Sequence, residues 1–280
     1  MTTDPVSPSY QTRRYPAWRA IASDLMKAYG EKNYIHGFLE VDVTEPRRII
    51  ADYKAATGGD FSFTAFLIGC LAQAVDDYKS VQALRQGSKL IIFDDVDVNV
   101  QVARDVGGET TLFTHIVRGA NRKSTRQVHD EIREVQQKKM TPDDVLAELP
   151  PSTRLALYLP GFLRRIIFRI LLNNPSFIRE ISGTCDITAI GMFGKEGGWG
   201  LPIPETSLDI TIGGIEKRMH WTGETFEPRE MLSLSISVDH DIIDGAPATR
   251  FGMRFKDLIE QAHGLDDLAV APPKKAGARR

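Results

Sequence analysis

The chain has 280 residues, of which 42% are apolar and 26% charged, and this is the composition of an ordinary globular protein. Its 35 basic and 37 acidic side chains leave a formal charge of -2, which excludes a global electrostatic attraction to nucleic acid or anionic lipid. Cys70 and Cys185 form neither a disulfide framework nor a zinc-binding spacing, and the N-terminus lacks a secretory signal. We therefore expect a soluble protein in the reducing cytoplasm.

Helices are expected where apolar residues recur at intervals of three and four. The first begins near Trp18 and ends at Tyr29, before Gly30, and the second is nearly all apolar with Ser62 as its N-cap. Ser124 occupies the same capping position in a polar amphipathic helix. The expected helices span residues 18–29, 61–78, 124–139, 155–172 and 246–262.

Strands are expected where β-branched and apolar residues alternate with polar ones or form short runs between turn signals. These segments are residues 36–43, 89–93, 96–103, 111–117, 184–192, 207–215 and 231–239. Because the strands outnumber the helices and do not alternate with them one for one, the predicted fold class is α+β, a mixed β-sheet with flanking helices. Residues 1–12 and the basic residues 271–280 have no periodicity, and we expect disordered tails there.

The segment 155–172 combines apolar residues with three arginines in an amphipathic pattern. On a helical wheel Ile166 and Ile170 fall on the apolar side, and the arginines, at positions 164, 165 and 169, lie mostly opposite. Packing against the rest of the same domain is the favoured interpretation. A subunit contact, a lid over a substrate channel and contact with a membrane surface are the alternatives. Three arginines so close together disfavour a transmembrane span.

The histidines other than His240 show no pairing at metal-ligand spacing, so we expect structural or surface roles for them and no metal site. They are His36, His115, His129, His220 and His263. The sequence contains no signature loop of serine hydrolases, P-loop proteins or dinucleotide-binding proteins. The glycine-rich stretch 194–198 lacks the order of a phosphate-binding loop, and a flexible loop is the better interpretation.

The motif that points to chemistry is His-x-x-x-Asp-Gly at His240, Asp244 and Gly245, between an expected strand and an expected helix. A histidine just past a strand end is presented toward a cleft and can accept a proton near neutral pH, as a general base must. The structural alternative is that Asp244 caps the following helix and Gly245 supplies a turn with positive φ. Spacing alone leaves both interpretations open.

Residues 237–248 read Ser-Val-Asp-His-Asp-Ile-Ile-Asp-Gly-Ala-Pro-Ala, and residues 186–194 form a strand-like stretch with a hydroxyl residue followed by Ile-Gly-Met-Phe-Gly. Together with residues 18–22 and 63–67, they resemble the catalytic domain of the dihydrolipoyl acyltransferase (E2) component of 2-oxo acid dehydrogenase complexes. That family is related in fold to chloramphenicol acetyltransferase, and Asp239 favours E2 over relatives with a second histidine there. The resemblance implies one catalytic domain over residues 13–270 with an insertion at 140–180.

The resemblance implies that His240 takes the proton of a thiol, of CoA or of dihydrolipoamide, and that the thiolate then attacks an acyl thioester. It implies that the hydroxyl of Thr188 donates a hydrogen bond to the oxygen of the tetrahedral intermediate. Threonine in place of the usual serine keeps the donor but crowds the site and restricts χ1. Asp244 would pair with an arginine near the N-terminus, a role that Arg19 matches. CoA or acyl-CoA would be a substrate, and no covalently bound cofactor is implied.

The resemblance also implies a homotrimer with each active site between two subunits, and with CoA and lipoamide entering from opposite ends of a channel. The sequence departs from the family in three ways. No lipoyl domain precedes the core, so we expect no lipoyl attachment site in this chain; Asp241 stands where the family usually has a basic residue; and the insertion at 140–180 and the loop 195–204 are long. These segments would close one channel mouth or block assembly into larger cages.

The function expected first is a stand-alone CoA-dependent acyltransferase whose thiol acceptor is a lipoyl group on another protein. A dehydrogenase component is expected as a further partner. A small-molecule O-acetyltransferase and a non-catalytic scaffold subunit of a 2-oxo acid dehydrogenase-type complex are the alternatives. His240, Asp244 and the hydroxyl at 188 favour catalysis, since a scaffold needs none of them. Neither nucleic acid nor a membrane surface is an expected partner.

Overall fold

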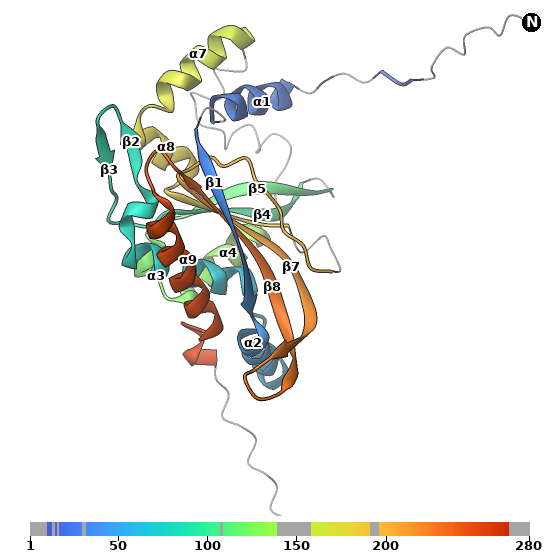
Figure 1. The fold of residues 1–280 in the computed structure, drawn as a ribbon. Helices are drawn as coiled ribbons and strands as arrows, with labels where there is room; N and C mark the ends of the chain where they lie inside the picture. The colour runs from blue at the N-terminus through green and yellow to red at the C-terminus, as the bar shows by residue number, and fades with distance from the viewer. Residues whose placement is uncertain are drawn as a thin grey trace, which may run out of the picture.

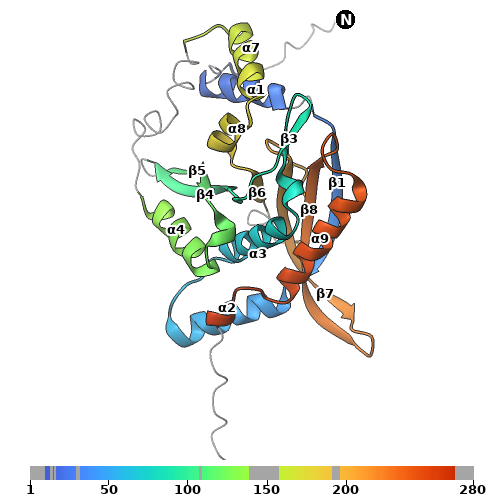
Figure 2. The same ribbon diagram turned by 90° about the vertical axis from the view of Figure 1, so that its left-hand side faces the viewer.

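A computed structural model describes residues 10–12, 15, 17–29, 32–106, 109–138, 158–190 and 196–268. Its centre is a six-stranded sheet with the strand order β1-β8-β7-β6-β4-β5, and helices cover one face of this sheet (Figures 1 and 2). The strands are β1 (Tyr34–Asp42), β4 (Val98–Val106), β5 (Glu109–Val117), β6 (Cys185–Ala189), β7 (Leu208–Trp221) and β8 (Phe226–Asp239). A separate hairpin is formed by β2 (Leu84–Gln86) and β3 (Lys89–Ile91).

Strand β6 runs parallel to both of its neighbours, β7 and β4, whereas the other strand pairs of the sheet are antiparallel. This mixed sheet with flanking helices confirms the predicted α+β fold class. Successive side chains of a strand point to opposite faces of the sheet, so the register decides what each face carries. Across the sheet, Thr188 of β6 lies beside Thr211 of β7, and Thr211 lies beside Ser235 of β8.

The helices are α1 (Ala17–Tyr29), α2 (Thr44–Thr57), α3 (Phe63–Asp77), α4 (Thr125–Gln137), α7 (Gly161–Leu171), α8 (Pro175–Ser182) and α9 (Gly245–Glu260). Both predicted N-caps are confirmed, because Ser62 accepts a hydrogen bond from the backbone of Ala65 and Ser124 forms a capping box with Gln127. The sequence prediction misses α2 and α8. A periodic signal is present in α2, because Ile49, Ile50 and Tyr53 follow the buried Pro46 at helical spacing and pack against the core, whereas α8 is short.

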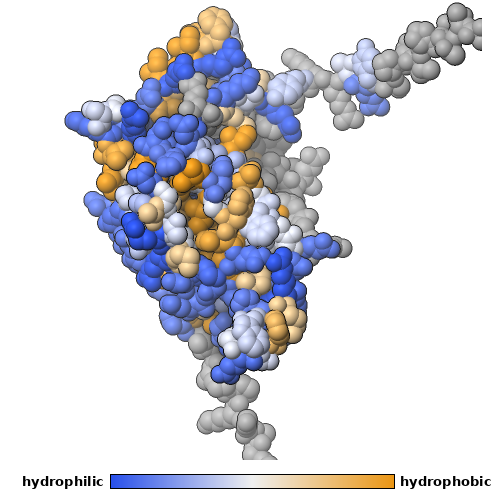
Figure 3. All heavy atoms as spheres, in the orientation of Figure 1, coloured by the Kyte–Doolittle hydropathy of each residue, from blue (hydrophilic) through white to orange (hydrophobic). Residues whose placement is uncertain are grey.

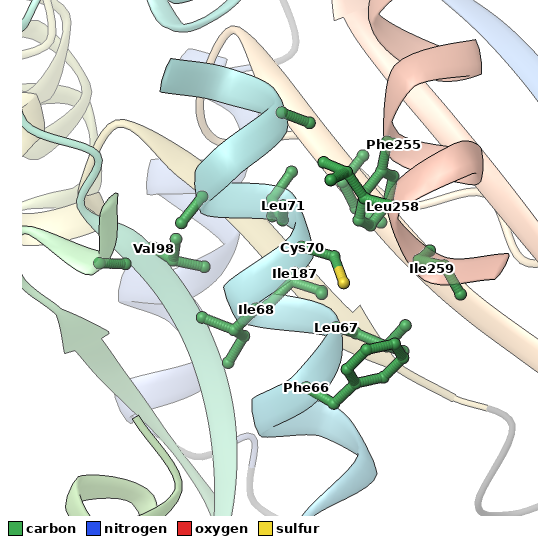
Figure 4. Packing of buried hydrophobic residues seen from close by; sticks show 14 of the residues in the cluster. Phe66, Leu67, Ile68, Cys70, Leu71, Val98, Ile187, Phe255, Leu258 and Ile259 are labelled. Carbon is green, nitrogen blue, oxygen red and sulfur yellow. The ribbon is translucent and has the colours of Figure 1, made fainter. Parts of the chain in front are cut away.

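The hydrophobic core lies between the helix-covered face of the sheet and helices α3 and α9 (Figure 4). Helix α3 is apolar nearly all round, with Phe66 and Ile68 fully buried, and Phe255 of α9 packs into the same cluster. Cys70 and Cys185 are also buried here and both are free thiols. Such dense packing holds the central strands, and with them the turns at their ends, in a fixed arrangement.

Helices α1 and α7 lie together at the end of the molecule opposite α2, with α7 on the outside (Figures 1 and 2). Arg164 of α7 donates hydrogen bonds from Nε and Nη2 to Oδ2 of Asp24 in α1, at 3.0 and 2.8 Å. Arg164 therefore faces inward, whereas Ile166 and Ile170 are 53% and 65% exposed. The helical-wheel assignment of these side chains is wrong, because the ion pair with Asp24 sets the rotation of α7. The beginning of the predicted helix, residues 155–157, lies outside the described residues.

Several predicted element boundaries also change. The expected strands 207–215 and 231–239 are parts of a longer hairpin, in which β7 reaches Trp221 and β8 starts at Phe226. The expected strand 89–93 belongs to the small β2–β3 hairpin and not to the main sheet. Apart from residues 10–12, the predicted tails lie outside the described residues. No helix in the described part of the chain has both the length and the apolar character needed to cross a membrane.

Candidate active site

His240 is the first residue after β8, where the chain turns toward α9. The turn is fixed from both sides: the backbone N–H of His240 donates to the carbonyl of Asn33 at 2.6 Å, and Ile243 is buried in the core. The preceding backbone N–H, of Asp239, donates to the carbonyl of Ser207 at 2.9 Å. The imidazole itself is 45% exposed. The structure thus holds the backbone of His240 rigidly and leaves its side chain accessible, as a general base requires.

Asp244 lies four residues beyond His240, and its Oδ1 is 4.0 Å from Nδ1 of His240. It occupies the N-cap position of α9, but its side chain makes no capping hydrogen bond and is 89% exposed. Gly245 does not have a positive φ. The structural alternative, in which the Asp244 side chain caps the helix and Gly245 supplies a turn with positive φ, is therefore wrong for both residues. At 4.0 Å the carboxylate acts on the imidazole by charge and not by a hydrogen bond.

Arg19 lies on α1, and its side chain is exposed. Asp244 pairs with His240. Helix α1, which carries Arg19, makes its main contact with α7. The pairing of Arg19 with Asp244 stays a prediction.

Thr188 is half-buried on β6, on the face of the sheet opposite the core, since its neighbour Ile187 points into the core at 1% exposure. It is level with Ser235 of β8, and His240 follows Ser235 by five residues on a strand two places away. With a rise of about 3.3 Å per residue and about 4.8 Å between strands, Thr188 and His240 are roughly 15–20 Å apart. One chain therefore does not bring these two predicted residues together.

The face that carries Thr188 is polar and yet buried. The serines of β8 at 233, 235 and 237, together with Asp186, Asp209 and Thr211, are each no more than 5% exposed. Asp186 accepts hydrogen bonds from the amide of Asn99 and the hydroxyl of Thr206. The sequence analysis missed this cluster, although the strict alternation of Leu, Ile and Ser or Asp along β7 and β8 signalled a polar face. That pattern ordinarily marks a solvated face, and only the structure shows that it is covered.

Residues 196–206 cover part of this face. Gly198 donates its backbone N–H to the hydroxyl of Ser233 and accepts one from Gly214. A Cβ atom on Gly213 would come within 2.0 Å of the carbonyl oxygen of Gly198, so only glycine permits this approach. Trp199 packs edge-on against Phe38 of β1, with ring centroids 6.2 Å apart. The backbone of residues 196–198 lies close to Gly213 and Gly214, the flexibility expected of this loop stays a prediction, and residues 194 and 195 lie outside the described residues.

Burial changes the acidity of the carboxyl groups beneath this cover. It raises the pKa of Asp209 to about 7, with the charge of Glu205 as the second cause. It raises the pKa of Asp186 well above its ordinary value, helped by the neighbouring charge of Asp209. The pKa of Glu205 is raised by burial as well. The polar face therefore holds acidic groups whose neutral form is favoured more than it is in water.

Three of the other histidines have structural contacts, as the sequence analysis expects. Nδ1 of His36 lies 2.8 Å from the hydroxyl of Ser237, Nδ1 of His129 accepts the backbone N–H of Ser62, and Nε2 of His115 lies 3.0 Å from Glu131. His220 and His263 are exposed. Within the described ranges, no three His, Cys, Asp or Glu side chains gather as a metal site would need.

A groove of about 210 Å³ lies between β1 and α9 and reaches Gly245, next to Asp244. Its walls are mostly apolar and include Ile35, Leu39 and Met253. Gly37 leaves the β1 wall open, because nothing lies within 4 Å of the position that its side chain would take. An apolar groove of this size suits an uncharged aliphatic chain.

The sequence profile of the 2-oxoacid dehydrogenases acyltransferase family (catalytic domain) matches residues 11–146 and 179–265. The chain belongs to this family. Residues 147–178, which include α7, fall outside the match to the acyltransferase profile. The expected family resemblance is thereby confirmed, and it covers the β6 strand with Thr188 as well as the turn with His240.

Two curated relatives of this acyltransferase-family chain illustrate the similarity. The lipoamide acyltransferase component of the branched-chain alpha-keto acid dehydrogenase complex of Bacillus subtilis is 24% identical over 251 residues, 86% of this chain and 50% of the relative. The dihydrolipoyllysine-residue acetyltransferase component of the pyruvate dehydrogenase complex of Buchnera aphidicola is 26% identical over 255 residues, 88% of this chain and 55% of the relative. The chain spans about half the length of these relatives.

Solved structures of the same family share the fold. A probable dihydrolipoamide acetyltransferase from Listeria monocytogenes aligns with a TM-score of 0.65 at 20% identity, over 91% of this chain and 95% of that chain. The dihydrolipoamide acetyltransferase of Azotobacter vinelandii aligns with the same TM-score and identity, over 94% of this chain and 99% of that one. These likenesses confirm the architecture of the acyltransferase domain.

Proposed function

We propose that this chain is an acyltransferase that moves an acyl group between CoA and a thiol, with a dihydrolipoyl group on another protein as the acceptor. The observation that carries the proposal is the accessible imidazole of His240, held at a rigid turn 4.0 Å from Asp244 in a chain of the acyltransferase family. The relatives named above act on lipoamide or on a dihydrolipoyllysine residue, which supports this acceptor. Cytoplasmic localisation stays a prediction.

In the proposed reaction, His240 removes the proton from the attacking thiol, and the thiolate forms a bond to the acyl carbon of the thioester. Nδ1 faces Asp244, so Nε2 is the nitrogen that takes the proton, and the carboxylate stabilises the imidazolium that results. When the tetrahedral intermediate collapses, the carbon–sulfur bond of the leaving thiolate breaks. That thiolate receives the proton from the imidazolium, and the histidine returns to its starting form.

The negative charge of the intermediate resides on the former carbonyl oxygen, where a hydroxyl donor stabilises it. Thr188 is our candidate donor. Because it is roughly 15–20 Å from His240 within one chain, we propose that the donor comes from a neighbouring subunit of a homotrimer. Trp199, Leu201 and Ile203 are 43%, 62% and 59% exposed on the segment that covers the Thr188 face, which supports a subunit contact there. A solved relative is the cubic core of a pyruvate dehydrogenase complex, so a family member of this fold does assemble.

The test is formation of acyl-dihydrolipoamide from acetyl-, succinyl- or branched-chain acyl-CoA, measured by mass spectrometry with purified protein. His240→Ala should lower kcat at least roughly a hundredfold. Thr188→Ala should lower it by a similar factor, and Thr188→Ser should retain activity because the donor survives. His220→Ala, on the exposed hairpin, is the matched control and should be neutral.

Two other outcomes would select the alternatives. Equal inactivity of the wild type and His240→Ala with free and protein-bound dihydrolipoyl acceptors and with alcohols supports a non-catalytic scaffold. Transfer to hydroxyl acceptors alone, still dependent on His240, supports a small-molecule O-acetyltransferase, since the same base deprotonates an alcohol.

A further inference from the structure

Helix α7 presents an apolar ridge on the side that faces away from α1. Phe162, Ile166 and Ile170 follow one another at four-residue intervals and are 63%, 53% and 65% exposed. Tyr158, just before the helix, is 86% exposed. Figure 3 shows hydrophobic surface at this upper end of the molecule, next to hydrophilic surface. The opposite side of α7 already buries Phe168, so the ridge is not needed to attach the helix.

The charge around the ridge is strongly positive. Helix α1 and residues 158–174 contain five basic residues and a single acidic one, Asp24, although the whole chain carries a formal charge of -2. Asp24 accepts hydrogen bonds from Arg164 on the inward side of α7, and Nη1 of Arg165 lies 3.9 Å from its Oδ1. The side chain of Arg165 is 51% exposed, and Arg169 is exposed one turn further along. Positive side chains therefore border the apolar ridge on the outer surface.

This surface is not part of the shared acyltransferase core. The family profile leaves out residues 147–178, and α7 lies within that interval. The match to the family profile therefore does not account for the ridge. It also lies at an extremity of the molecule, where α7 is outermost in both ribbon views, so the body of the protein does not obstruct an approaching surface (Figures 1 and 2).

We propose that α7 binds the surface of a membrane that contains anionic phospholipids. An amphipathic helix lies in the plane of such a surface, with its aromatic and aliphatic side chains among the upper acyl chains and its arginines at the phosphate groups. The ridge of Phe162, Ile166 and Ile170 is about 12 Å long and provides the apolar side chains that enter the acyl region. Arg165 and Arg169 provide the contacts to the phosphate groups, because guanidinium groups bind phosphates through paired hydrogen bonds.

Charge and shape favour a lipid surface over the two alternatives, which are a second copy of α7 and a groove on another protein. Two copies of α7 packed against each other would bring their arginines together, with no acidic residue in 158–174 to compensate. A protein groove that accepts a helix surrounds much of its circumference. Here α1 occupies one side of α7 and leaves a single convex row of side chains. The proposal stands apart from the acyl-transfer reaction, since none of these residues belongs to the proposed catalytic site.

The experiment is vesicle sedimentation of the full-length protein. At about 0.1 M salt, the wild type should bind vesicles of phosphatidylglycerol mixed with phosphatidylcholine, and should bind vesicles of phosphatidylcholine alone at least roughly tenfold more weakly. Raising the salt to about 0.5 M should weaken binding to the mixed vesicles, because screening removes the electrostatic part. Arg165→Gln with Arg169→Gln should lower the partition coefficient roughly tenfold or more. Phe162→Ser, Ile166→Ser and Ile170→Ser combined should reduce it by at least as much.

Matched controls remove similar groups elsewhere. Trp221→Ser with Phe226→Ser removes exposed apolar side chains from the β7–β8 hairpin tip, and Lys54→Gln with Lys217→Gln removes two exposed positive charges. Both control pairs should bind vesicles like the wild type. The proposal is overturned if the wild type does not bind anionic vesicles, or if the controls lose as much binding as the α7 variants. It is also overturned if the triple serine variant changes the oligomeric state without lipid, which would make α7 a contact between copies.

Discussion

Thr188 and His240 are carried by the same sheet but are separated by two strand positions and by five residues along β8. In the proposed reaction, the acyl carbon that a His240-activated thiolate would attack and the oxygen that Thr188 would stabilise belong to the same carbonyl group. One chain cannot place both side chains on that group at this separation. Cooperation between the two residues therefore requires two subunits, and this requirement can be tested without a structure of the assembly.

We expect two inactive variants to restore each other when they are assembled together. His240→Ala and Thr188→Ala subunits should be co-expressed with different affinity tags, and mixed assemblies should be isolated through both tags. In a cyclic trimer that contains both kinds of subunit, one of the three interfaces combines an intact histidine with an intact threonine. The acyl-transfer rate of the doubly purified trimers should therefore approach about a third of the wild-type rate, far above that of either parent.

The control is each variant assembled with a differently tagged copy of itself, which should remain inactive. Native mass spectrometry should verify that the doubly purified sample contains both kinds of subunit in one particle. A verified mixed particle that is no more active than its parents would show that the two residues do not meet across an interface.

The sequence predicts the His240 turn well because the information is local. Alternation along β8, the end of the strand and the motif up to Gly245 all lie within one short segment. The rotation of α7 depends instead on the pair Asp24–Arg164, whose members are 140 residues apart in the chain. No helical wheel contains that partner. The wheel therefore places Ile166 and Ile170 inside, and the structure places them outside.

The covered polar face illustrates a second limit of the sequence. The alternation along β7 and β8 is visible in the sequence, but the cluster of Asp186, Asp209 and Ser235 was not predicted, because such alternation ordinarily marks a solvated face. Their burial depends on residues 196–206, which have no regular secondary structure and hence no periodic signal. The raised pKa values of the buried carboxyl groups follow from this covering segment and could not be predicted before it was seen.

Asp209 should make the stability of the fold dependent on pH. Its pKa is 3.8 in an ordinary environment and about 7 in the fold, so the folded state favours the protonated form. Its contribution is fully present below about pH 4 and is lost as the pH rises through 7. The loss amounts to at most roughly 4 kcal/mol, since each pKa unit corresponds to about 1.4 kcal/mol.

Asp209→Asn keeps the shape and removes the charge. We expect it to raise the melting temperature by several degrees at pH 8 and by less at pH 5, with the difference measured by calorimetry. Asp257→Asn on the exposed side of α9 is the control and should not alter the pH profile. An Asp209→Asn profile parallel to that of the wild type between pH 5 and 8 would contradict a raised pKa at this position.

The Asp24–Arg164 pair should determine whether α7 stays on α1. The side chains of Asp24 and Arg164 are only 10% and 13% exposed, so Asp24→Ala leaves a largely buried guanidinium without its carboxylate. Breaking such a pair costs about 3 kcal/mol. The loss should be local, and hydrogen exchange measured by mass spectrometry should speed up in α1 and α7 while α3 and β8 keep their protection.

Glu45→Ala is the matched control, because it removes a carboxylate from the exposed pair with Arg48, whose side chains are 51% and 58% exposed. That pair is worth less than about 1 kcal/mol, and exchange in α1 and α7 should not change. Unchanged protection of α7 in Asp24→Ala would mean that Leu163, Ile167 and Phe168 hold the helix by apolar packing alone. The exchange experiment also helps to interpret the vesicle experiment. If Asp24→Ala loosens α7, hydrogen exchange in α7 should accelerate and binding to vesicles should weaken; if exchange in α7 is unchanged, binding should be unchanged as well.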